Sequence, residues 1–256
     1  MFRPNPLNKK VADGGCAIGC WSHLASPIAA EIVALAGYDF LIIDHEHGPG
    51  HYLDATSIMQ AISATPCASF LRVPWNDAVH LKRALDTGVD GVIIPYVRSA
   101  EEACQAVDAC FYPPAGTRGM AHVLARASDY GMKMNEYADQ LEENLCVTCM
   151  VETPDGVRAI PEMAKLERLS MIFIGPFDLS TSMGISGQFE HPEFRSMLSD
   201  AEAAVKASGK LLGSIATGVD DAAALRDRGY QFVVASSDLL LLREAALTNL
   251  ETSRPA

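Results

Sequence analysis

Short apolar segments rich in β-branched residues alternate with longer amphipathic segments along the whole chain. The short segments predict strands at residues 16–21, 39–44, 68–73, 91–95, 146–151, 171–175, 211–215 and 231–235. The amphipathic segments predict helices at 27–36, 52–64, 78–87, 100–110, 156–164, 192–208, 220–228 and 239–249. This alternation favours a parallel sheet whose strands are joined by helices.

The number of strand–helix pairs distinguishes between two α/β architectures. Eight such pairs in 256 residues have the size and order of a (β/α)8 barrel. An open doubly wound sheet usually carries a glycine-rich phosphate turn after its first strand, and Trp21-Ser22-His23-Leu24 is not such a turn. We therefore expect an α/β fold, a single TIM barrel that forms one domain over residues 1–256.

The charge balance limits the partners of this chain. It has 20 basic and 32 acidic residues, a formal charge of −12, and no cluster of Lys or Arg. Such a surface repels nucleic acid and anionic membranes, so neither is expected as a partner. No apolar run approaches the roughly 20 residues of a membrane span, and the first residues lack a secretory signal. With seven widely spaced cysteines, the sequence favours a cytoplasmic protein with reduced thiols.

Charged residues follow several of the predicted strands directly. Residues 44–47 read Asp-His-Glu-His after the second strand, and Arg72 lies at the end of the third. Glu152 follows the fifth strand, and residues 175–178 read Gly-Pro-Phe-Asp at the end of the sixth. The carboxyl ends of barrel strands meet at one rim, where barrel enzymes have their active sites. We therefore expect these residues to converge.

The carboxylates of Glu152 and Asp178 are hard oxygen ligands that suit Mg²⁺ or Mn²⁺. Two protein ligands leave about four positions for water and for a chelating 2-oxo acid. Arg72 is always charged and could stabilise an enolate oxygen beside the metal. The amides after Gly175 could hold the substrate carboxylate. None of the seven lysines follows a predicted strand, which favours a metal over a Schiff base.

His47 is the natural proton carrier at this rim, because histidine titrates near neutral pH. Asp44, three residues earlier, could fix its tautomer. His45 and His51 are rival candidates, although His45 lies nearer the strand and is better interpreted as a packed or supporting residue.

These residues also carry a family resemblance. The chain resembles the HpcH/HpaI family of class II, metal-dependent pyruvate aldolases, which includes 2-dehydro-3-deoxyglucarate and 4-hydroxy-2-oxoheptanedioate aldolases. The resemblance extends from about residue 15 to residue 245. The matching segments are 38–49, 71–74, 116–119, 125–127, 151–156 and 174–180. The D-x-E-H run together with the G-P-x-D-L-S run makes it specific.

The resemblance implies a metal and a set of substrate contacts. Glu152 and Asp178 would bind a divalent metal such as Mg²⁺, Mn²⁺ or Co²⁺. Arg72 would contact the keto oxygen of pyruvate. The amides of Phe177 and Asp178 would receive the carboxylate, with Gly175 beside them.

The resemblance also implies acid–base residues and an assembly. His47, paired with Asp44, would be the acid–base residue, and Glu46 would hold metal-bound water. The chain would form a homo-hexamer, a trimer of dimers, in which the C-terminal helix is exchanged between subunits and the loop at 116–130 completes a neighbouring site.

Two residues depart from the family pattern. His45 stands where many members have Gly, and it could compete with His47 for the proton. Phe177 stands where a small residue is usual, and its bulk could narrow the pocket or change the aldehyde. The long irregular segment at 111–133 adds Arg118 and Arg126, which are candidates for the distal end of the substrate and equally for salt bridges that order the loop.

These observations predict an aldolase that cleaves and forms 4-hydroxy-2-oxo acids. The products of cleavage would be pyruvate, formed through its enolate, and an aldehyde. An oxaloacetate decarboxylase or a CoA-thioester lyase on the same scaffold is the nearest alternative. A barrel that binds a ligand without catalysis is a further one.

Overall fold

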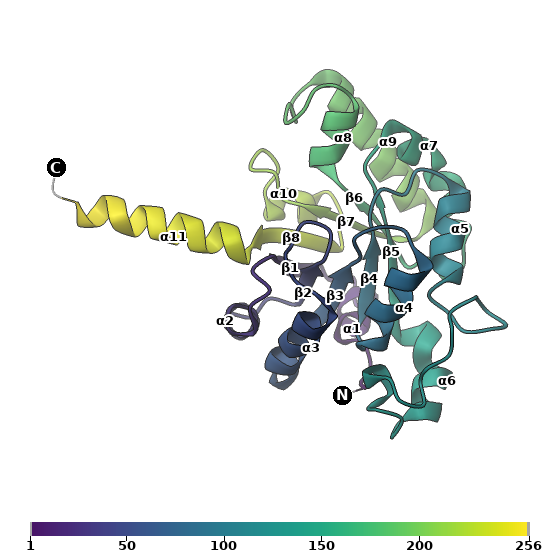
Figure 1. Cartoon of the computed structure of the whole chain (residues 1–256). Coiled ribbons are helices and arrows are strands. Elements are labelled where there is room, and N and C mark those ends of the chain that lie inside the picture. Colours follow the sequence, from purple (N-terminus) through teal and green to yellow (C-terminus); the bar gives the residue numbers. More distant parts are fainter. Residues whose placement is uncertain (1, 255–256) are drawn as a thin grey trace.

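The computed structural model describes residues 2–254 of the chain. Within them, eight parallel strands close into a barrel in sequence order, which confirms the predicted (β/α)8 fold (Figure 1). The strands are β1 (Ala17–Ser22), β2 (Phe40–Asp44), β3 (Ala68–Arg72), β4 (Gly91–Ile94), β5 (Cys146–Val151), β6 (Met171–Ile174), β7 (Leu211–Ile215) and β8 (Phe232–Ser237).

The predicted helices are all present, with small shifts at their ends, and all but the last of them surround the barrel. They are α2 (Pro27–Leu35), α3 (Tyr52–Ala61), α4 (Ala78–Asp86), α5 (Ala100–Asp108), α7 (Pro154–Met163), α9 (Pro192–Ser208), α10 (Ala222–Asp227) and α11 (Asp238–Ser253). The predicted helix at 52–64 ends in a separate 3-10 turn, η1 (Ile62–Ala64). Side-chain caps set several starts; for example, the Thr153 hydroxyl accepts from the Gly156 amide at the start of α7.

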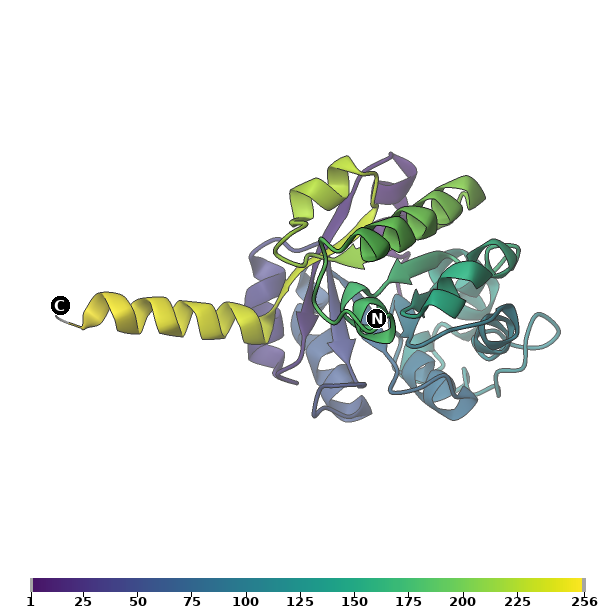
Figure 2. The ribbon, with the colours of Figure 1, turned by 90° about the horizontal axis from the view of Figure 1, so that it is seen from above.

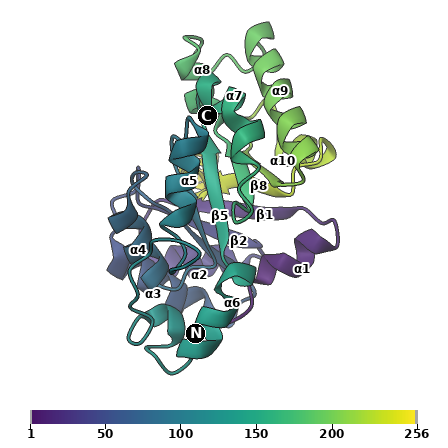
Figure 3. The same ribbon diagram turned by 90° about the vertical axis from the view of Figure 1, so that its right-hand side faces the viewer.

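Several helical elements were not predicted from the sequence. They are α1 (Pro6–Ala12), the 3-10 turn η2 (Arg126–Ser128), α6 (Met134–Asn144) and α8 (Pro176–Ser182). Viewed from the side, α6 lies at the end of the molecule where β5 begins, and α8 lies at the opposite end (Figure 3). Helix α6 therefore marks the amino-terminal rim of the barrel, and α8 marks the rim at the carboxyl ends of the strands.

Strand register brings the predicted site residues together. Asp44 and Arg72, the last residues of β2 and β3, are direct partners across the sheet. Val151 and Ile174 pair in the same way, so that Glu152 and Gly175 leave β5 and β6 side by side. The carboxyl ends of four strands therefore deliver their polar residues to one place.

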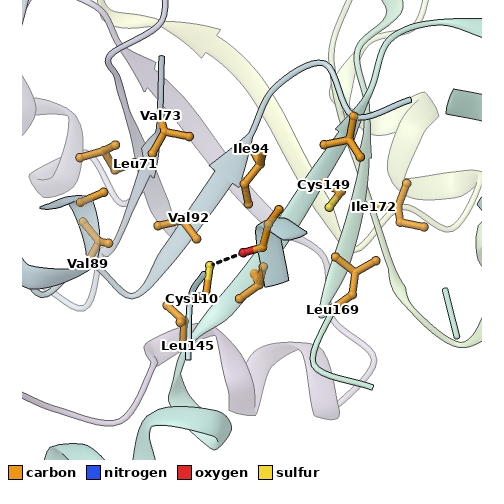
Figure 4. Close-up of a cluster of buried hydrophobic side chains, with 14 of the residues drawn as sticks. Leu71, Val73, Val89, Val92, Ile94, Cys110, Leu145, Cys149, Leu169 and Ile172 are labelled. Atoms are coloured by element: carbon orange, nitrogen blue, oxygen red, sulfur yellow. Dashed lines mark hydrogen bonds between the residues drawn. The ribbon is translucent and has the colours of Figure 1, made fainter. Parts of the chain in front are cut away.

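The barrel interior is filled by aromatic rings that face glycines. The Phe40 and Phe232 rings stack with centroids 3.6 Å apart, and Phe70 packs edge-on against both. A Cβ at Gly19 would lie 2.0 Å from the Phe40 ring. A second apolar layer, which includes Val92, Cys149 and Ile172, lies between the strands and the helices (Figure 4).

We expect Gly19→Ala to lower the free energy of unfolding by about 1–3 kcal/mol, the usual cost of overpacking a filled core. The Phe40 ring cannot yield because Phe232 and Phe70 hold it from two sides. Urea denaturation measures the change. Gly119→Ala is the matched control, because its Cβ would meet the nearest atom, of Lys82, at an ordinary 3.5 Å. Equal stability of the two variants would contradict this description of the core.

The last helix, α11, extends away from the barrel (Figures 1 and 2). Among its described residues Asp238 is buried, and five leucines are 37–61% exposed: Leu239, Leu241, Leu242, Leu247 and Leu250. Helix α2 likewise leaves Ile28, Ile32 and Leu35 between 64% and 71% exposed. Both helices therefore present apolar surface that this chain does not cover.

The seven cysteines are all free thiols. No helix within residues 2–254 is both long enough and apolar enough to cross a bilayer.

Candidate active site

An open pocket of about 570 Å³ lies at the carboxyl ends of the strands. Five of the predicted site residues line it: Arg72, Glu152, Gly175, Phe177 and Asp178. Its wall also includes Trp21 and His23, from the end of β1, and Ser237, from the end of β8. The sequence-based expectation that these strand ends converge agrees with this arrangement.

Arg72 is buried at the base of the site and holds two carboxylates. Its Nε and one terminal nitrogen donate to the two oxygens of Asp44 at 2.9 and 2.8 Å. Its other terminal nitrogen lies 2.8 Å from Oε2 of Glu46. The guanidinium carbon also lies 4.3 Å from the centre of the Trp21 ring. These contacts, one for each side of the planar guanidinium group, hold it in a single orientation.

Asp44 is a permanently ionised partner of Arg72. Burial alone would raise the pKa of its carboxyl group, but hydrogen bonds from His23 and Arg72 outweigh burial and hold that pKa well below its usual range. The negative charge of Asp44 is therefore neutralised by Arg72 rather than by a proton.

Glu152 is only 4% exposed, although it carries a carboxylate. Its Oε2 accepts a hydrogen bond of 2.9 Å from the amide of Tyr96, a residue held in the left-handed region with φ of 55°. Burial is the main cause that raises the pKa of Glu152 to about 7, and the nearby carboxylates of Asp178 and Glu46 contribute to the same shift. This side chain is poised to exchange a proton for a metal cation.

Gly175 makes room for that carboxylate. A Cβ at position 175 would lie 2.7 Å from Cγ and 2.8 Å from Oε1 of Glu152. Gly175 is also the N-cap of α8, which places Phe177 and Asp178 in the first helical turn. The Phe177 ring packs edge-on against Phe189, with centroids 5.0 Å apart, and is about half exposed.

The donor set fits a divalent metal. Burial and the nearby carboxylate of Asp178 raise the pKa values of both Glu46 and Glu152, and the pocket is lined by the guanidinium of Arg72. Within residues 2–254, no three His, Cys, Asp or Glu side chains are grouped as a ready metal cage. Two carboxylates, Glu152 and Asp178, suit an open site in which water and substrate supply the other ligands.

The raised pKa of Glu152 makes metal binding pH-dependent. Below about pH 7 the carboxyl group must lose a proton before it binds a cation, so the affinity for Mn²⁺ should fall roughly tenfold per pH unit. Above pH 7 it should level off. Folding raises the pKa of this carboxyl group from 4.5 to about 7, so the protonated form favours the folded state. In the absence of metal, this stabilisation is lost as pH rises from about 4.5 through about 7.

Calorimetric titration with Mn²⁺ in buffers of different ionisation enthalpy measures the protons released. About one proton per metal is expected at pH 6 and almost none at pH 8. Binding without proton release at pH 6 would contradict the raised pKa.

The predicted pair of Asp44 and His47 is wrong in this structure. Both oxygens of Asp44 are engaged by Arg72, and Oδ2 also lies 3.1 Å from Nε2 of His23. The imidazole of His47 is 65% exposed, with Nε2 3.9 Å from Oε2 of Glu46. The Asp44 carboxylate faces across the sheet to Arg72, its partner on β3, whereas the side chain of His47, three residues later, is turned to the surface.

His45 packs behind the pocket and does not line it. Its ring lies edge-on to Tyr52, with centroids 5.3 Å apart, and its amide donates to the carbonyl of Arg72. Burial lowers the pKa of its imidazole.

Arg118 and Arg126 lie away from the pocket of their own chain. Arg118 is buried and donates to Asp86 and to the Tyr137 hydroxyl. Arg126 donates to the carbonyl of Thr87. Asp86 ends α4, and Thr87 follows it. Because a barrel helix ends at the amino-terminal rim, these arginines do not reach the pocket within one subunit, and the Arg118–Asp86 ion pair agrees with the alternative expectation of salt bridges that order the loop.

The sequence analysis missed His23 and Asp238. The Nε2 of His23 contacts Asp44, and the Asp238 carboxylate accepts from the His23 amide. Both residues directly follow a strand, β1 or β8. Position directly after a strand, which identified Glu152, holds for them too, but the predicted first and eighth strands end at residues 21 and 235, short of β1 and β8.

Comparison with known proteins agrees with this geometry. Residues 17–245 match the family described as HpcH/HpaI aldolase/citrate lyase. A hydroxypyruvate/pyruvate aldolase of Chromohalobacter salexigens is 39% identical over 243 residues, 95% of each chain. A 4-hydroxy-2-oxo-heptane-1,7-dioate aldolase of Escherichia coli is 36% identical over 94% of this chain and 92% of its own.

A crystal structure of an HpcH/HpaI aldolase/citrate lyase family protein from Burkholderia cenocepacia J2315 superposes with a TM-score of 0.91. It shares 32% sequence identity, and the match covers 98% of this chain and 100% of that one. The family match and these relatives extend over nearly the whole barrel, site residues included. The chain therefore belongs to the HpcH/HpaI aldolase family.

Proposed function

We propose that this chain is a class II pyruvate aldolase that cleaves and forms 4-hydroxy-2-oxo acids. The observation that carries the proposal is the buried carboxylate of Glu152, which shares one pocket with Asp178 and with the guanidinium of Arg72. A buried acid with a raised pKa beside a fixed cation is suited to hold a metal and to stabilise an enolate. Relatives named as aldolases support the same reaction class.

Glu152 and Asp178 would hold the divalent metal, Mg²⁺, Mn²⁺ or Co²⁺. When bound, the metal supplies a Lewis acid that chelates the 2-oxo acid and polarises its keto group. The protein's own part is to hold the Glu152 carboxylate at the pocket, and the absence of a side chain at Gly175 leaves the space that this carboxylate occupies.

Arg72 stabilises the negative charge that develops on the keto oxygen. Asp44 and Glu46 hold the guanidinium in place before substrate arrives, so no reorganisation is needed during the reaction. The amides of Phe177 and Asp178, in the first turn of α8, would receive the carboxylate of the substrate.

Cleavage requires two proton movements. A base removes the proton of the C4 hydroxyl, the C4–O bond becomes a carbonyl, and the electrons of the C3–C4 bond remain on the pyruvate half as an enolate. An acid then protonates C3. His47, at the exposed edge of the site and near Glu46, would accept the hydroxyl proton as the aldehyde half leaves.

We extend the proposal to a hexamer, a trimer of dimers, in which α11 is exchanged between subunits. The exposed leucines of α11 and the exposed apolar face of α2 support it, because each needs a cover that this chain does not provide. The loop at 116–130, which carries Arg126 to the opposite rim, would then complete a neighbour's site.

The double variant Leu242→Glu/Leu247→Glu should break this assembly, because it buries two charges in the contact. Sedimentation velocity should show the wild type as a hexamer and the variant as a smaller species. Thr248→Glu is the control on the same helix. A monomeric wild type, or an unchanged assembly in the double variant, would contradict the exchange.

Cleavage itself is tested by a screen of 4-hydroxy-2-oxo acids of increasing chain length, with pyruvate release as the readout. Each acid is assayed with added Mn²⁺ and again after removal of metal by EDTA. We expect pyruvate release with metal and its loss after stripping. Binding of the acids without pyruvate release would favour a non-catalytic barrel, and undiminished cleavage by stripped protein would exclude the metal mechanism.

A further inference from the structure

His23 lies on the wall of the pocket, one residue after β1. Its Nε2 is 3.1 Å from Oδ2 of Asp44, and its side chain is 24% exposed. Its ring is tilted by 32° against that of Trp21, with centroids 5.8 Å apart. The imidazole therefore contacts an aromatic ring and a carboxylate, and part of it remains exposed to the pocket.

The backbone that carries His23 is held by one buried carboxylate. Asp238, the first residue of α11, accepts from the amides of His23 and Leu24 at 2.9 and 3.2 Å. It also lies 3.3 Å from the hydroxyl of Ser22. These contacts fix the loop between β1 and α2 and so preorganise the imidazole.

The contact with Asp44 determines the tautomer of His23. An ionised carboxylate can only accept hydrogen bonds, so Nε2 of His23 must carry the hydrogen in that contact. In the neutral ring Nδ1 then holds the lone pair. Within residues 2–254, no protein group forms a hydrogen bond with Nδ1. This is the arrangement of a histidine whose free nitrogen is available as a base.

The two histidines nearest the site face different places. His23 shares a pocket wall with Arg72, Glu152 and Asp178, where the pyruvate half would sit. His47 is outside that lining and mostly exposed at the edge. A reaction with two proton movements, one on each half of the substrate, can use one histidine for each.

We propose that His23 is the acid–base residue for C3 of the pyruvate half, an inference that rests on the proposed aldolase function. In cleavage, the imidazolium of His23 donates the Nδ1 proton to C3 of the enolate, which becomes the methyl group of pyruvate. Neutral His23 then regains a proton from solvent, and His47 returns to solvent the proton taken from the C4 hydroxyl. In aldol addition, neutral Nδ1 removes the C3 proton and the enolate forms.

Pyruvate alone reports the C3 step, because exchange of its methyl hydrogens in D₂O involves no aldehyde. His23→Gln is the informative variant: a glutamine amide can still donate to Asp44, yet it cannot carry a proton. With Mn²⁺ we expect the exchange rate, followed by proton NMR, to fall at least about 100-fold. The concentration of pyruvate at half-maximal rate should change less than about threefold, because binding is untouched.

The controls separate catalysis from folding. His191→Gln, at a histidine outside the pocket at the start of α9, should leave exchange unchanged, and the thermal unfolding midpoint of His23→Gln should match that of the wild type. Exchange within twofold of the wild type in His23→Gln, or loss of exchange in His47→Gln alone, would overturn the proposal. Absence of exchange in the wild type would instead refute the proposed function.

A second measurement needs no activity. Long-range ¹H–¹⁵N NMR of the metal-free wild type, with His23 assigned by comparison with His23→Gln, reads the tautomer directly. We expect the neutral ring of His23 to carry its hydrogen on Nε2. A hydrogen on Nδ1 would overturn the proposal whatever the outcome of the exchange experiment.

Discussion

Arg72→Ala is expected to lower the retro-aldol kcat by roughly 10²–10³-fold, the usual effect of removing one preorganised donor from a developing oxyanion. The loss should be this large because the guanidinium is buried and faces the site with fixed geometry. It should appear in kcat more than in KM, since the charge on the keto oxygen develops in the transition state. Steady-state kinetics of pyruvate release measure both.

Arg98→Ala is the matched control for Arg72→Ala. Arg98 also lies over an aromatic ring, that of Tyr96, and also pairs with a carboxylate, that of Glu102, but it is exposed outside the pocket. Its removal should leave kcat nearly unchanged. An Arg72→Ala enzyme with turnover within twofold of the wild type would show that this guanidinium does not stabilise the enolate.

Glu152→Gln should remove most of the metal affinity and with it the activity. The substitution keeps the size of the side chain and still offers an oxygen to the Tyr96 amide, but it lacks the negative charge. Loss of the Lewis acid costs several kcal/mol of transition-state stabilisation, which corresponds to a decrease in kcat of about 10³-fold at limiting Mn²⁺. Calorimetric titration and kinetics at several Mn²⁺ concentrations measure the two effects.

The Glu152→Gln variant should also lose the proton release seen at pH 6, because the group that titrates is gone. Glu162→Gln, an exposed glutamate on the following helix α7, is the control and should bind Mn²⁺ as the wild type does. Unaltered Mn²⁺ affinity in Glu152→Gln would contradict its role as a ligand.

The barrel could be predicted from the sequence because its signal is repeated. Each strand is a short apolar run, and several of the helices between them, such as α4, α5 and α7, have a clear amphipathic pattern, so a boundary error of one or two residues changes nothing in the topology. Helix α6 was not predicted because it lacks such a pattern. Its buried side chains are Tyr137 and Leu141, too few to form an apolar stripe along the helix. Helix α1 buries a single residue, Leu7.

The members of the site could be predicted, but not how they pair. Position after a strand brings Arg72, Glu152 and Asp178 to one rim in any barrel of this order. The partner of Asp44 depends on register, which sets it opposite Arg72, and on a loop from β1 that is distant in sequence. Proximity in sequence favoured His47, whereas the pairing of β1 with β2, in which Ser22 lies opposite Ile43, brings His23 beside Asp44.

The arginines of the long loop show the same limit. Arg118 and Arg126 follow β4 in sequence, as a residue of the catalytic rim would. The chain between β4 and these arginines instead returns along α5, and Arg126 donates to the carbonyl of Thr87, directly after α4, at the other rim. A segment without a periodic apolar pattern does not reveal from its sequence toward which rim of the barrel it runs.

The most direct test of the account is a crystal structure with Mn²⁺ and pyruvate in which anomalous scattering locates the metal. The account predicts one peak between the carboxylates of Glu152 and Asp178, with pyruvate chelating the same ion and its keto oxygen within reach of Arg72. A peak at any other position, or pyruvate bound away from the metal, would contradict it.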